Sequence, residues 1–152
     1  MTDKDQLHEL LDIEAIKQLK ARYFRLMDLK QWDDWGLVFA TDCVMEVPEA
    51  DMVNTGRQEI VASVSGALVG ARTCHHGHMP EIQITGGTAR GIWAMFDYVE
   101  WDEQPGGTRV GLQGYGHYRE EYRKEDGAWR IARIRLERLR VDVLGAALEL
   151  PE

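Results

Sequence analysis

Cysteine is scarce in this sequence, with Cys43 and Cys74 the only two among 152 residues. Two isolated thiols give neither the ligand spacing of a zinc site nor a disulfide framework. Because free cysteines are among the side chains most often buried, we expect both to be packed. The sequence therefore predicts a fold that depends on a hydrophobic core and not on covalent cross-links.

Long apolar runs and an excess of positive charge are also missing. No apolar run approaches the roughly 18–20 residues that cross a bilayer, and the N-terminus MTDKDQLHEL lacks the apolar stretch of a secretion signal. The net charge is -8 and the pI about 5.1, whereas phosphate binding favours a basic surface. We therefore expect a soluble, cytoplasmic protein with no membrane and no nucleic-acid partner, although one anionic small ligand stays compatible with this charge.

The composition that is present is typical of a globular domain. Hydrophobic residues make up 44% of the chain and charged residues 29%, which is ordinary for soluble proteins. A chain of this length is large enough to bury a core, and corresponds to one domain. No repeat, low-complexity tract or linker divides it, so we predict a single domain over residues 1–152.

Helical periodicity dominates the first half of the chain. Apolar residues recur at helical spacing from Asp5 to Leu29, and Asp12 is placed where it could end one helix and cap a second. Three further elements are expected before Gly70: a short helix after Lys30, a strand from Asp42 to Val47, and a helix from Gln58 to Val69.

The second half reads as a run of strands. The predicted strands are Thr73–Thr85, Thr88–Glu103, Arg109–Lys124 and Ala128–Leu144, with turns at residues 86–87, 105–107 and 126–127 and a short, loose tail from Gly145. Helices followed by long antiparallel strands predict an α+β fold, in which helices pack on one face of a curved sheet. Such a sheet leaves a conical cavity suited to a small ligand.

Two polar residues near the end of the first helix are candidates for chemistry. Tyr23 continues the apolar stripe of Ile16 and Leu19, so its phenol should point inward and needs a partner or a ligand. Asp28 lies five residues further on, which turns it by roughly 140° from Tyr23 on an α-helix. It faces the same cavity only if the helix ends or the pocket wraps around it. The alternative is a core tyrosine and a solvated aspartate.

Three of the five histidines lie within four positions, at His75, His76 and His78. Period two puts His75 and His76 on opposite faces of a strand. A histidine exchanges protons near neutral pH, and a neighbouring carboxylate fixes its tautomer. A metal site is a rival interpretation that lacks a second ligand pair at the common zinc spacings; a structural histidine cluster is another. For His117 we favour a packing role, because no spacing pairs it with a carboxylate.

Two charged residues on the long strands form a further candidate pair. Asp97 alternates with large apolar residues, and Arg138 shares its parity with Ile134 and Leu136. Burying an unpaired carboxylate is costly, so an inward Asp97 needs a cation, which Arg138 offers. Both faces of these strands are apolar enough that alternation does not decide between an inward pair and two exposed charges.

Four stretches carry a family resemblance: DIEAIKQLKARYFRLMD at 12–28 with Trp32-Asp33, HHGHMPEI at 75–82, ARGIW at 89–93 up to Asp97, and YRKEDGAW at 122–129. They resemble the SnoaL-like branch of the nuclear transport factor 2-like superfamily, and within it the bile acid 7α-dehydratase group. The resemblance covers about 12–140. Its first two stretches are fairly specific, whereas the Asp-Gly-x-Trp hairpin is common across the superfamily.

The resemblance implies a cone-shaped α+β barrel, in which N-terminal helices pack on a strongly curved antiparallel sheet that encloses a pocket. By position, the catalytic tyrosine, helix aspartate and histidine of the dehydratase fall on Tyr23, Asp28 and His75, and its strand aspartate and pocket arginine on Asp97 and Arg138. It implies neither a cofactor nor a metal. The basic last strand, RIRLERLR at 133–140, departs from the dehydratase pattern and leaves the substrate open.

Two functions from different classes fit these residues. The first is a cofactor-free acid–base dehydratase, a hydro-lyase, or in second place a double-bond isomerase. Its substrate would be a small, apolar, steroid-like or other polycyclic carbonyl compound, free or as a thioester. The second is a non-catalytic module for ligand binding or assembly, since one fold hosts both. Whether His76 or His78 shares the role of His75 stays open. The long aromatic-rich strands predict a homo-oligomer, and the family resemblance implies a trimer or a dimer.

Overall fold

The computed structural model describes residues 1–104 and 108–145. The turn predicted at 105–107 and the tail after Gly145 lie outside these residues. In chain order the elements are α1 (Asp3–Asp28), α2 (Trp32–Gly36), β1 (Phe39–Val47), the 3-10 turn η1 (Pro48–Ala50), β2 (Met52–Thr55), α3 (Arg57–Ala67), β3 (Ala71–Thr85), β4 (Thr88–Gln104), β5 (Thr108–Glu125) and β6 (Ala128–Leu144).

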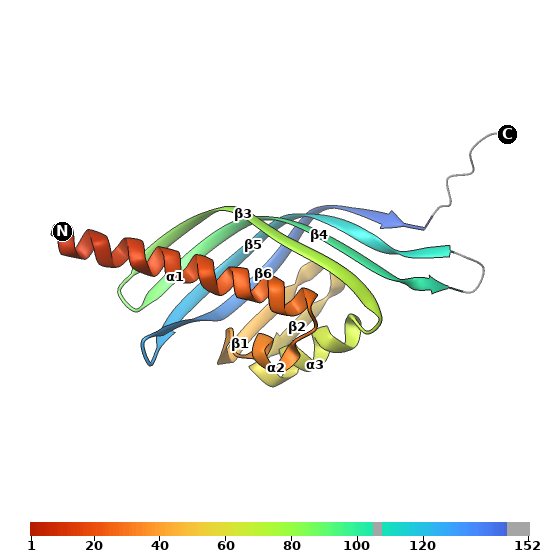
Figure 1. Cartoon of the computed structure of the whole chain (residues 1–152), viewed down its shortest axis with the longest axis horizontal. Coiled ribbons are helices and arrows are strands. Elements are labelled where there is room, and N and C mark those ends of the chain that lie inside the picture. Colours follow the sequence, from red (N-terminus) through yellow and green to blue (C-terminus); the bar gives the residue numbers. More distant parts are fainter. Residues whose placement is uncertain (105–107, 146–152) are drawn as a thin grey trace.

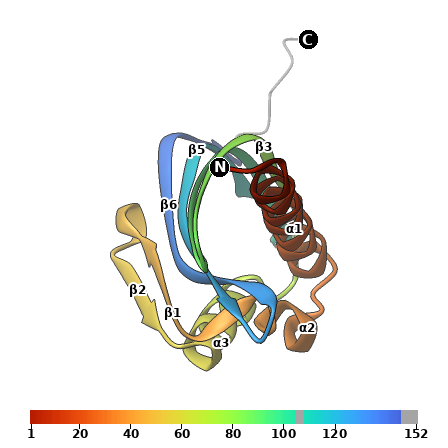
Figure 2. The same ribbon diagram turned by 90° about the vertical axis from the view of Figure 1, so that its left-hand side faces the viewer.

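The described strands form a six-stranded sheet in the order β2-β1-β6-β5-β4-β3. The long strands β3 to β6 pair with their chain neighbours in antiparallel fashion, whereas β1 runs parallel to β6. The sheet curls around α1, with α2 and α3 together beside its first strands (Figures 1 and 2). This is the α+β arrangement expected from the sequence, with helices packed into a curved and mostly antiparallel sheet.

Helix α1 is continuous over 26 residues. The Asp5 backbone N–H donates to the Thr2 hydroxyl at 3.2 Å, and the Thr2 backbone N–H donates to the Asp5 carboxylate at 2.9 Å, which closes a capping box. The break predicted at Asp12 does not occur. The Asp12 carboxylate instead accepts hydrogen bonds from Lys124 at 2.7 Å and Trp129 at 2.8 Å, which tie the helix to the β5–β6 hairpin.

The two ends of α1 have different surroundings. Its first turns extend beyond the sheet, so Leu10 is 63% exposed although it follows the helical spacing, and the buried stripe begins only at Ile16. From there the helix lies across the concave face of the sheet (Figure 1). Among the described residues, no helix is both long and apolar enough to cross a membrane.

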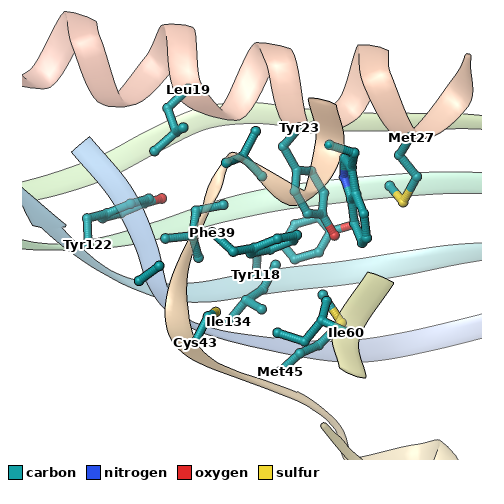
Figure 3. Packing of buried hydrophobic residues seen from close by; sticks show 14 of the residues in the cluster. Leu19, Tyr23, Met27, Phe39, Cys43, Met45, Ile60, Tyr118, Tyr122 and Ile134 are labelled. Atoms are coloured by element: carbon teal, nitrogen blue, oxygen red, sulfur yellow. The ribbon is translucent and has the colours of Figure 1, made fainter. Parts of the chain in front are cut away.

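The core lies between α1 and the concave face of the sheet (Figure 3). The Tyr23 ring meets those of Phe39 and Tyr118 edge-on, with centroids 5.9 and 6.0 Å apart, an arrangement that aromatic quadrupoles favour. Burying each large apolar side chain stabilises the fold by about 1.5–3 kcal/mol. Cys43 is part of this core, but Cys74 is exposed. The prediction that both are packed is therefore wrong for Cys74, which faces away from α1.

Strand β2 and the parallel pairing of β1 with β6 are absent from the sequence prediction. β2 has only four residues, of which Asn54 alone is buried, so its alternation is too short to stand out. The parallel contact is a tertiary one: the Ile131 backbone N–H donates to the Val38 carbonyl at 2.9 Å. Pairing of this kind depends on how distant segments pack and leaves no local pattern.

Candidate active site

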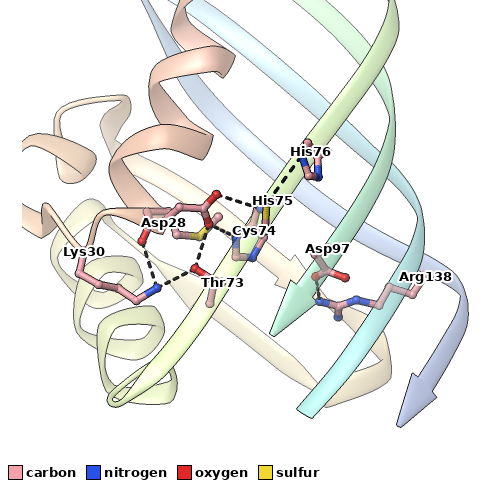
Figure 4. A network of polar contacts seen from close by, with 9 residues as sticks. Asp28, Lys30, Thr73, Cys74, His75, His76, Asp97 and Arg138 are labelled. Carbon is pink, nitrogen blue, oxygen red and sulfur yellow. Dashed lines mark hydrogen bonds and ion pairs between the residues drawn. The ribbon is translucent and has the colours of Figure 1, made fainter. Parts of the chain in front are cut away.

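Three neighbouring strands place the candidate residues side by side. His75 on β3 lies opposite Asp97 on β4, and Asp97 lies opposite Gly114 on β5. Directly opposed residues in an antiparallel pair share a face of the sheet, and Asp97 is on the buried, concave face. His75 and Asp97 therefore both point toward the interior, where α1 ends at Asp28 (Figure 4).

Asp28 and His75 are in direct contact. The Asp28 Oδ1 is 2.6 Å from His75 Nδ1, and Asp28 Oδ2 accepts the His75 backbone N–H at 3.0 Å. The Thr73 hydroxyl donates to Oδ1 at 2.9 Å and accepts from Lys30 Nζ at 2.6 Å. Asp28 reaches the interior because it is the last residue of α1 and β3 passes that end of the helix. The predicted contact is confirmed; the catalytic roles of both residues stay a prediction.

The surroundings of Asp28 favour its charged form. Burial opposes ionisation, but the hydrogen bonds from the His75 ring and backbone and from Thr73 outweigh it and hold the pKa of Asp28 below its ordinary value. A carboxylate only accepts hydrogen bonds, so the ring proton of a neutral His75 lies on Nδ1. The His75 Nε2 lone pair then remains available for a substrate proton. The His75 side chain is only 7% exposed, which limits its exchange with bulk water.

Asp97 and Arg138 form the second predicted contact. Arg138 Nη2 donates to Asp97 Oδ2 at 2.5 Å. The Arg138 side chain is 16% exposed and that of Asp97 1%. A second carboxylate, Glu49 of η1, binds Arg138 Nη1 and was not foreseen. Burial opposes the charge of Arg138, but Asp97 and Glu49 outweigh it and raise its pKa.

Gly114 makes room for this pair. A Cβ on Gly114 would lie 2.1 Å from Asp97 Oδ1 and 2.6 Å from Arg138 Nε. Among the described residues, these two buried atoms have no hydrogen-bond partner. Both atoms therefore lie against the bare backbone of β5, and a larger residue at position 114 would push the pair apart.

Gly114→Ala should therefore destabilise the protein by about 3 kcal/mol, because overpacking adds to the loss of a buried ion pair. Urea denaturation followed by circular dichroism measures this. Gly87→Ala is the matched control, since a Cβ at Gly87 meets nothing within 4 Å. Equal stability of the two variants would show that the ion pair does not depend on Gly114.

Tyr23 lies behind these groups and is only 4% exposed, as its place in the apolar stripe predicts. Burial, and then Tyr118 and Glu120, raise its pKa well above the ordinary value, so its hydroxyl stays protonated and can donate. Tyr118 was missed in the sequence. The Tyr118 ring lies beside that of Tyr23, and burial and then Asp97 raise its pKa. The sequence did hold a signal for its inward position, because Tyr118 alternates in step with Tyr122 along β5.

The other three histidines of the sheet belong to its opposite face. His76 is exposed, and its ring stacks on Phe96 with centroids 5.7 Å apart and on His78 at 5.9 Å. His117, half-buried, lies opposite Ala94 on the same outer face. The structure therefore does not bring these three rings to Asp28 and Asp97. Within residues 1–104 and 108–145, no group of three or more His, Cys, Asp or Glu side chains is arranged to hold a metal ion.

Apolar side chains continue the concave face beyond the ion pair. Leu112 lies opposite Val99 on one side and Val143 on the other, and Val141 lies opposite Gly114. Val141 is 42% and Val143 81% exposed, so an apolar surface borders the charged residues. A separate hollow of about 600 Å³ lies among charged side chains of the outer face, and none of the five candidate residues lines it.

The helices packed on a curled, mostly antiparallel sheet are the arrangement of a nuclear transport factor 2-like domain. The family model described as a SnoaL-like domain matches residues 8–135. The chain therefore belongs to the SnoaL-like family, as the sequence motifs indicated. Its resemblance to the bile acid 7α-dehydratase group in particular stays a prediction.

Known proteins similar to this chain span several reactions. A proposed cyclase, FGR4, from Gibberella zeae is 27% identical over 135 residues, which cover 82% of this chain and 89% of the relative. A candidate scytalone dehydratase from Novosphingobium aromaticivorans superposes with a TM-score of 0.79 at 19% identity, over 95% and 97% of the two chains. A hexachlorocyclohexane dehydrochlorinase, LinA type 3, from Novosphingobium barchaimii has a TM-score of 0.75 at 17% identity, over 97% and 99%.

The two solved structures establish the fold alone, because their sequence identity to this chain is too low to carry a shared function. Together with the family match, the relatives support an enzyme that converts a small molecule, at the level of the family. They do not favour a particular reaction or substrate for this chain.

Proposed function

We propose that this protein is a cofactor-free dehydratase that uses His75 as its acid–base group. The observation that carries the proposal is the 2.6 Å contact between Asp28 Oδ1 and His75 Nδ1 on the concave face of the sheet. A carboxylate that orients a histidine and fixes its tautomer is the arrangement general base catalysis needs. The lowered pKa of Asp28 supports the charged partner that this arrangement requires.

The proposed reaction is an elimination next to a carbonyl group. His75 Nε2 takes a proton from the carbon beside the carbonyl, and the C–H electron pair forms the new double bond. Tyr23 donates a hydrogen bond to the carbonyl oxygen as negative charge develops there. The neighbouring C–O bond breaks, and the leaving hydroxyl takes the proton from His75 and departs as water. The Asp97–Arg138 pair shapes the wall beside the reacting atoms and assists proton movement.

The substrate we propose is a small, apolar, steroid-like or other fused-ring carbonyl compound, free or as a thioester. The apolar side chains of Leu112, Val141 and Val143 on the concave face support an apolar ligand. A double-bond isomerase is the second candidate, because the same histidine can return the proton to a different carbon. Neither reaction needs a resident cofactor.

The experiment is a turnover screen by mass spectrometry, with hydroxylated 3-keto steroids and other fused-ring hydroxyketones, free and as thioesters. Loss of one water from a compound by the parent, and no loss with His75→Gln, would support the dehydratase. A shifted double bond without loss of water would identify the isomerase. Binding of these compounds by calorimetry without conversion would instead support the non-catalytic ligand-binding module.

We also propose that the whole chain, 1–152, is one domain of a cytoplasmic homo-oligomer, a trimer or a dimer. Apolar side chains remain exposed on the outer face of the sheet, with Leu139 79% and Tyr115 37% exposed, and surfaces of this kind mark interfaces.

Light scattering at micromolar concentration should therefore give a multiple of the 17.4 kDa chain mass. Leu139→Glu should lower that mass, because it places a charge in the interface. Val53→Glu, on a similarly exposed residue of β2, should not. A parent that scatters as a monomer would remove the proposal.

A further inference from the structure

A buried lysine lies directly behind the candidate site. Lys20 of α1 and Glu120 of β5 form an ion pair in which both side chains are 0% exposed. Lys20 belongs to the buried face of α1 between Ile16 and Tyr23. Its charge has no part in the elimination described above, although a buried charge is costly to hold.

The Lys20 ammonium contacts two phenol rings at once. Its Nζ lies 3.7 Å from the ring centroids of both Tyr23 and Tyr118, and 4.7 Å from that of Phe24. A cation at this distance is attracted by the negative face of each ring. Lys20 therefore holds the two rings in a fixed relation to each other.

Glu120 connects this cation to a longer polar chain. It also accepts a hydrogen bond from the Tyr122 hydroxyl, which in turn accepts one from Trp93 Nε1 at 2.8 Å. Buried polar networks of this kind rigidify a core when every member has a partner. The position of Lys20 against the phenols is thus set by contacts from two strands.

We propose that Lys20, held by Glu120, is a positioning residue that fixes the Tyr23 and Tyr118 rings and sets the hydrogen-bond donor strength of their hydroxyls. The proposal rests on the proposed function, in which Tyr23 donates to the substrate oxygen. A cation on the face of a phenol withdraws electron density and makes its O–H a better donor. The Glu120 carboxylate has the opposite effect, so the phenols respond to the charge balance of the pair.

This balance changes with pH. Burial lowers the pKa of Lys20 to about 8, against the opposing effect of Glu120. Burial raises the pKa of each neighbouring phenol and thiol above its ordinary value, so these groups stay neutral near pH 8. Among the described residues, the titratable groups that contact Lys20 or act on Glu120 are Tyr118 and Tyr122 of β5, Tyr23 of α1 and Cys43 of β1. Asp97 of β4 acts on both phenols. Loss of the Lys20 proton leaves the Glu120 carboxylate without its cation, and the two phenols become poorer donors.

Carbon NMR of the full chain with Cζ-labelled tyrosine tests this without a substrate. The Tyr23 and Tyr118 signals should move together with a midpoint near pH 8, while that of Tyr115, on the outer face, should not. The shared inflection should vanish in Lys20→Met/Glu120→Gln, which removes both charges. Lys20→Arg should also lose it, because a guanidinium does not titrate in this range. A parent without the shared inflection, or a folded variant that keeps it, would overturn the proposal.

Turnover of a compound found in the screen tests the effect of the Lys20–Glu120 pair on catalysis. Lys20→Arg should lose the alkaline decline in kcat near pH 8. Lys20→Met/Glu120→Gln should lower kcat by about tenfold with KM within about twofold, as expected for an interaction made in the transition state. An unchanged pH profile of kcat in Lys20→Arg, together with an unchanged kcat in Lys20→Met/Glu120→Gln, would make the pair structural only. If no compound is converted, the proposed function fails, while the NMR titration still decides whether Lys20 controls the phenols.

Discussion

Replacing His75 by glutamine should lower kcat by about 10²- to 10⁴-fold, the usual contribution of a general acid–base group. Glutamine cannot exchange a proton near neutral pH, but its amide can still donate to Asp28. The second bond to Asp28 comes from the backbone N–H of residue 75, which glutamine retains. We therefore expect a melting temperature close to that of the parent.

The matched control for this experiment is His76→Gln. His76 is the next residue of β3, but its ring lies on the outer face against Phe96. The His76→Gln variant should retain the parent kcat on the compound found in the screen. Equal losses in the two variants would mean that the tandem histidines act through folding or assembly. A normal kcat in His75→Gln, with substrate still converted, would exclude His75 as the acid–base group.

How far the sequence predicts this site depends on the residue. Helical spacing alone predicted the burial of Tyr23, because its stripe with Ile16 and Leu19 is long. Alternation could not decide the direction of Asp97, since both faces of β4 are apolar. Helical spacing argued against an inward Asp28, because it turns that residue away from Tyr23. Spacing does not show which strand passes the end of the helix. For these residues the family motifs supplied the placement, and the contacts of β3 with α1 explain it.

Other features had no local signal. Lys20 and Glu120 are 100 residues apart in sequence, and each looks like an ordinary surface charge on its own. The periodicity of α1 does put Lys20 beside Tyr23 on the buried face, so the lysine itself was detectable. Its partner was not, because the β5 alternation puts Glu120 on the face of Tyr118 and Tyr122 but does not indicate which residue of α1 it meets. Glu49 reaches Arg138 through a short turn after β1, and a contact of that kind depends on tertiary packing.

Removing the guanidinium of Arg138 should cost about 3–5 kcal/mol of folding free energy, the usual effect of leaving one charge of a buried pair behind. Asp97 is the residue left behind, and its side chain is 1% exposed. Arg138→Ala should therefore melt well below the parent and lose turnover, in contrast to His75→Gln. Glu49 is 37% exposed and can return to water, so it should add little to the loss.

The source of this loss can be separated by a second substitution. Asp97→Asn/Arg138→Met removes both charges and keeps most of the volume, so it should recover much of the stability without recovering turnover. Arg140→Ala is the control on the same strand, because that side chain is 71% exposed, and it should change stability by less than about 0.5 kcal/mol. Chemical denaturation with all four proteins gives the free energies. If Arg138→Ala unfolds with the same free energy as Arg140→Ala, the pair contributes nothing to the fold, and the wall it provides beside His75 must be held by the apolar side chains of β4 and β5 alone.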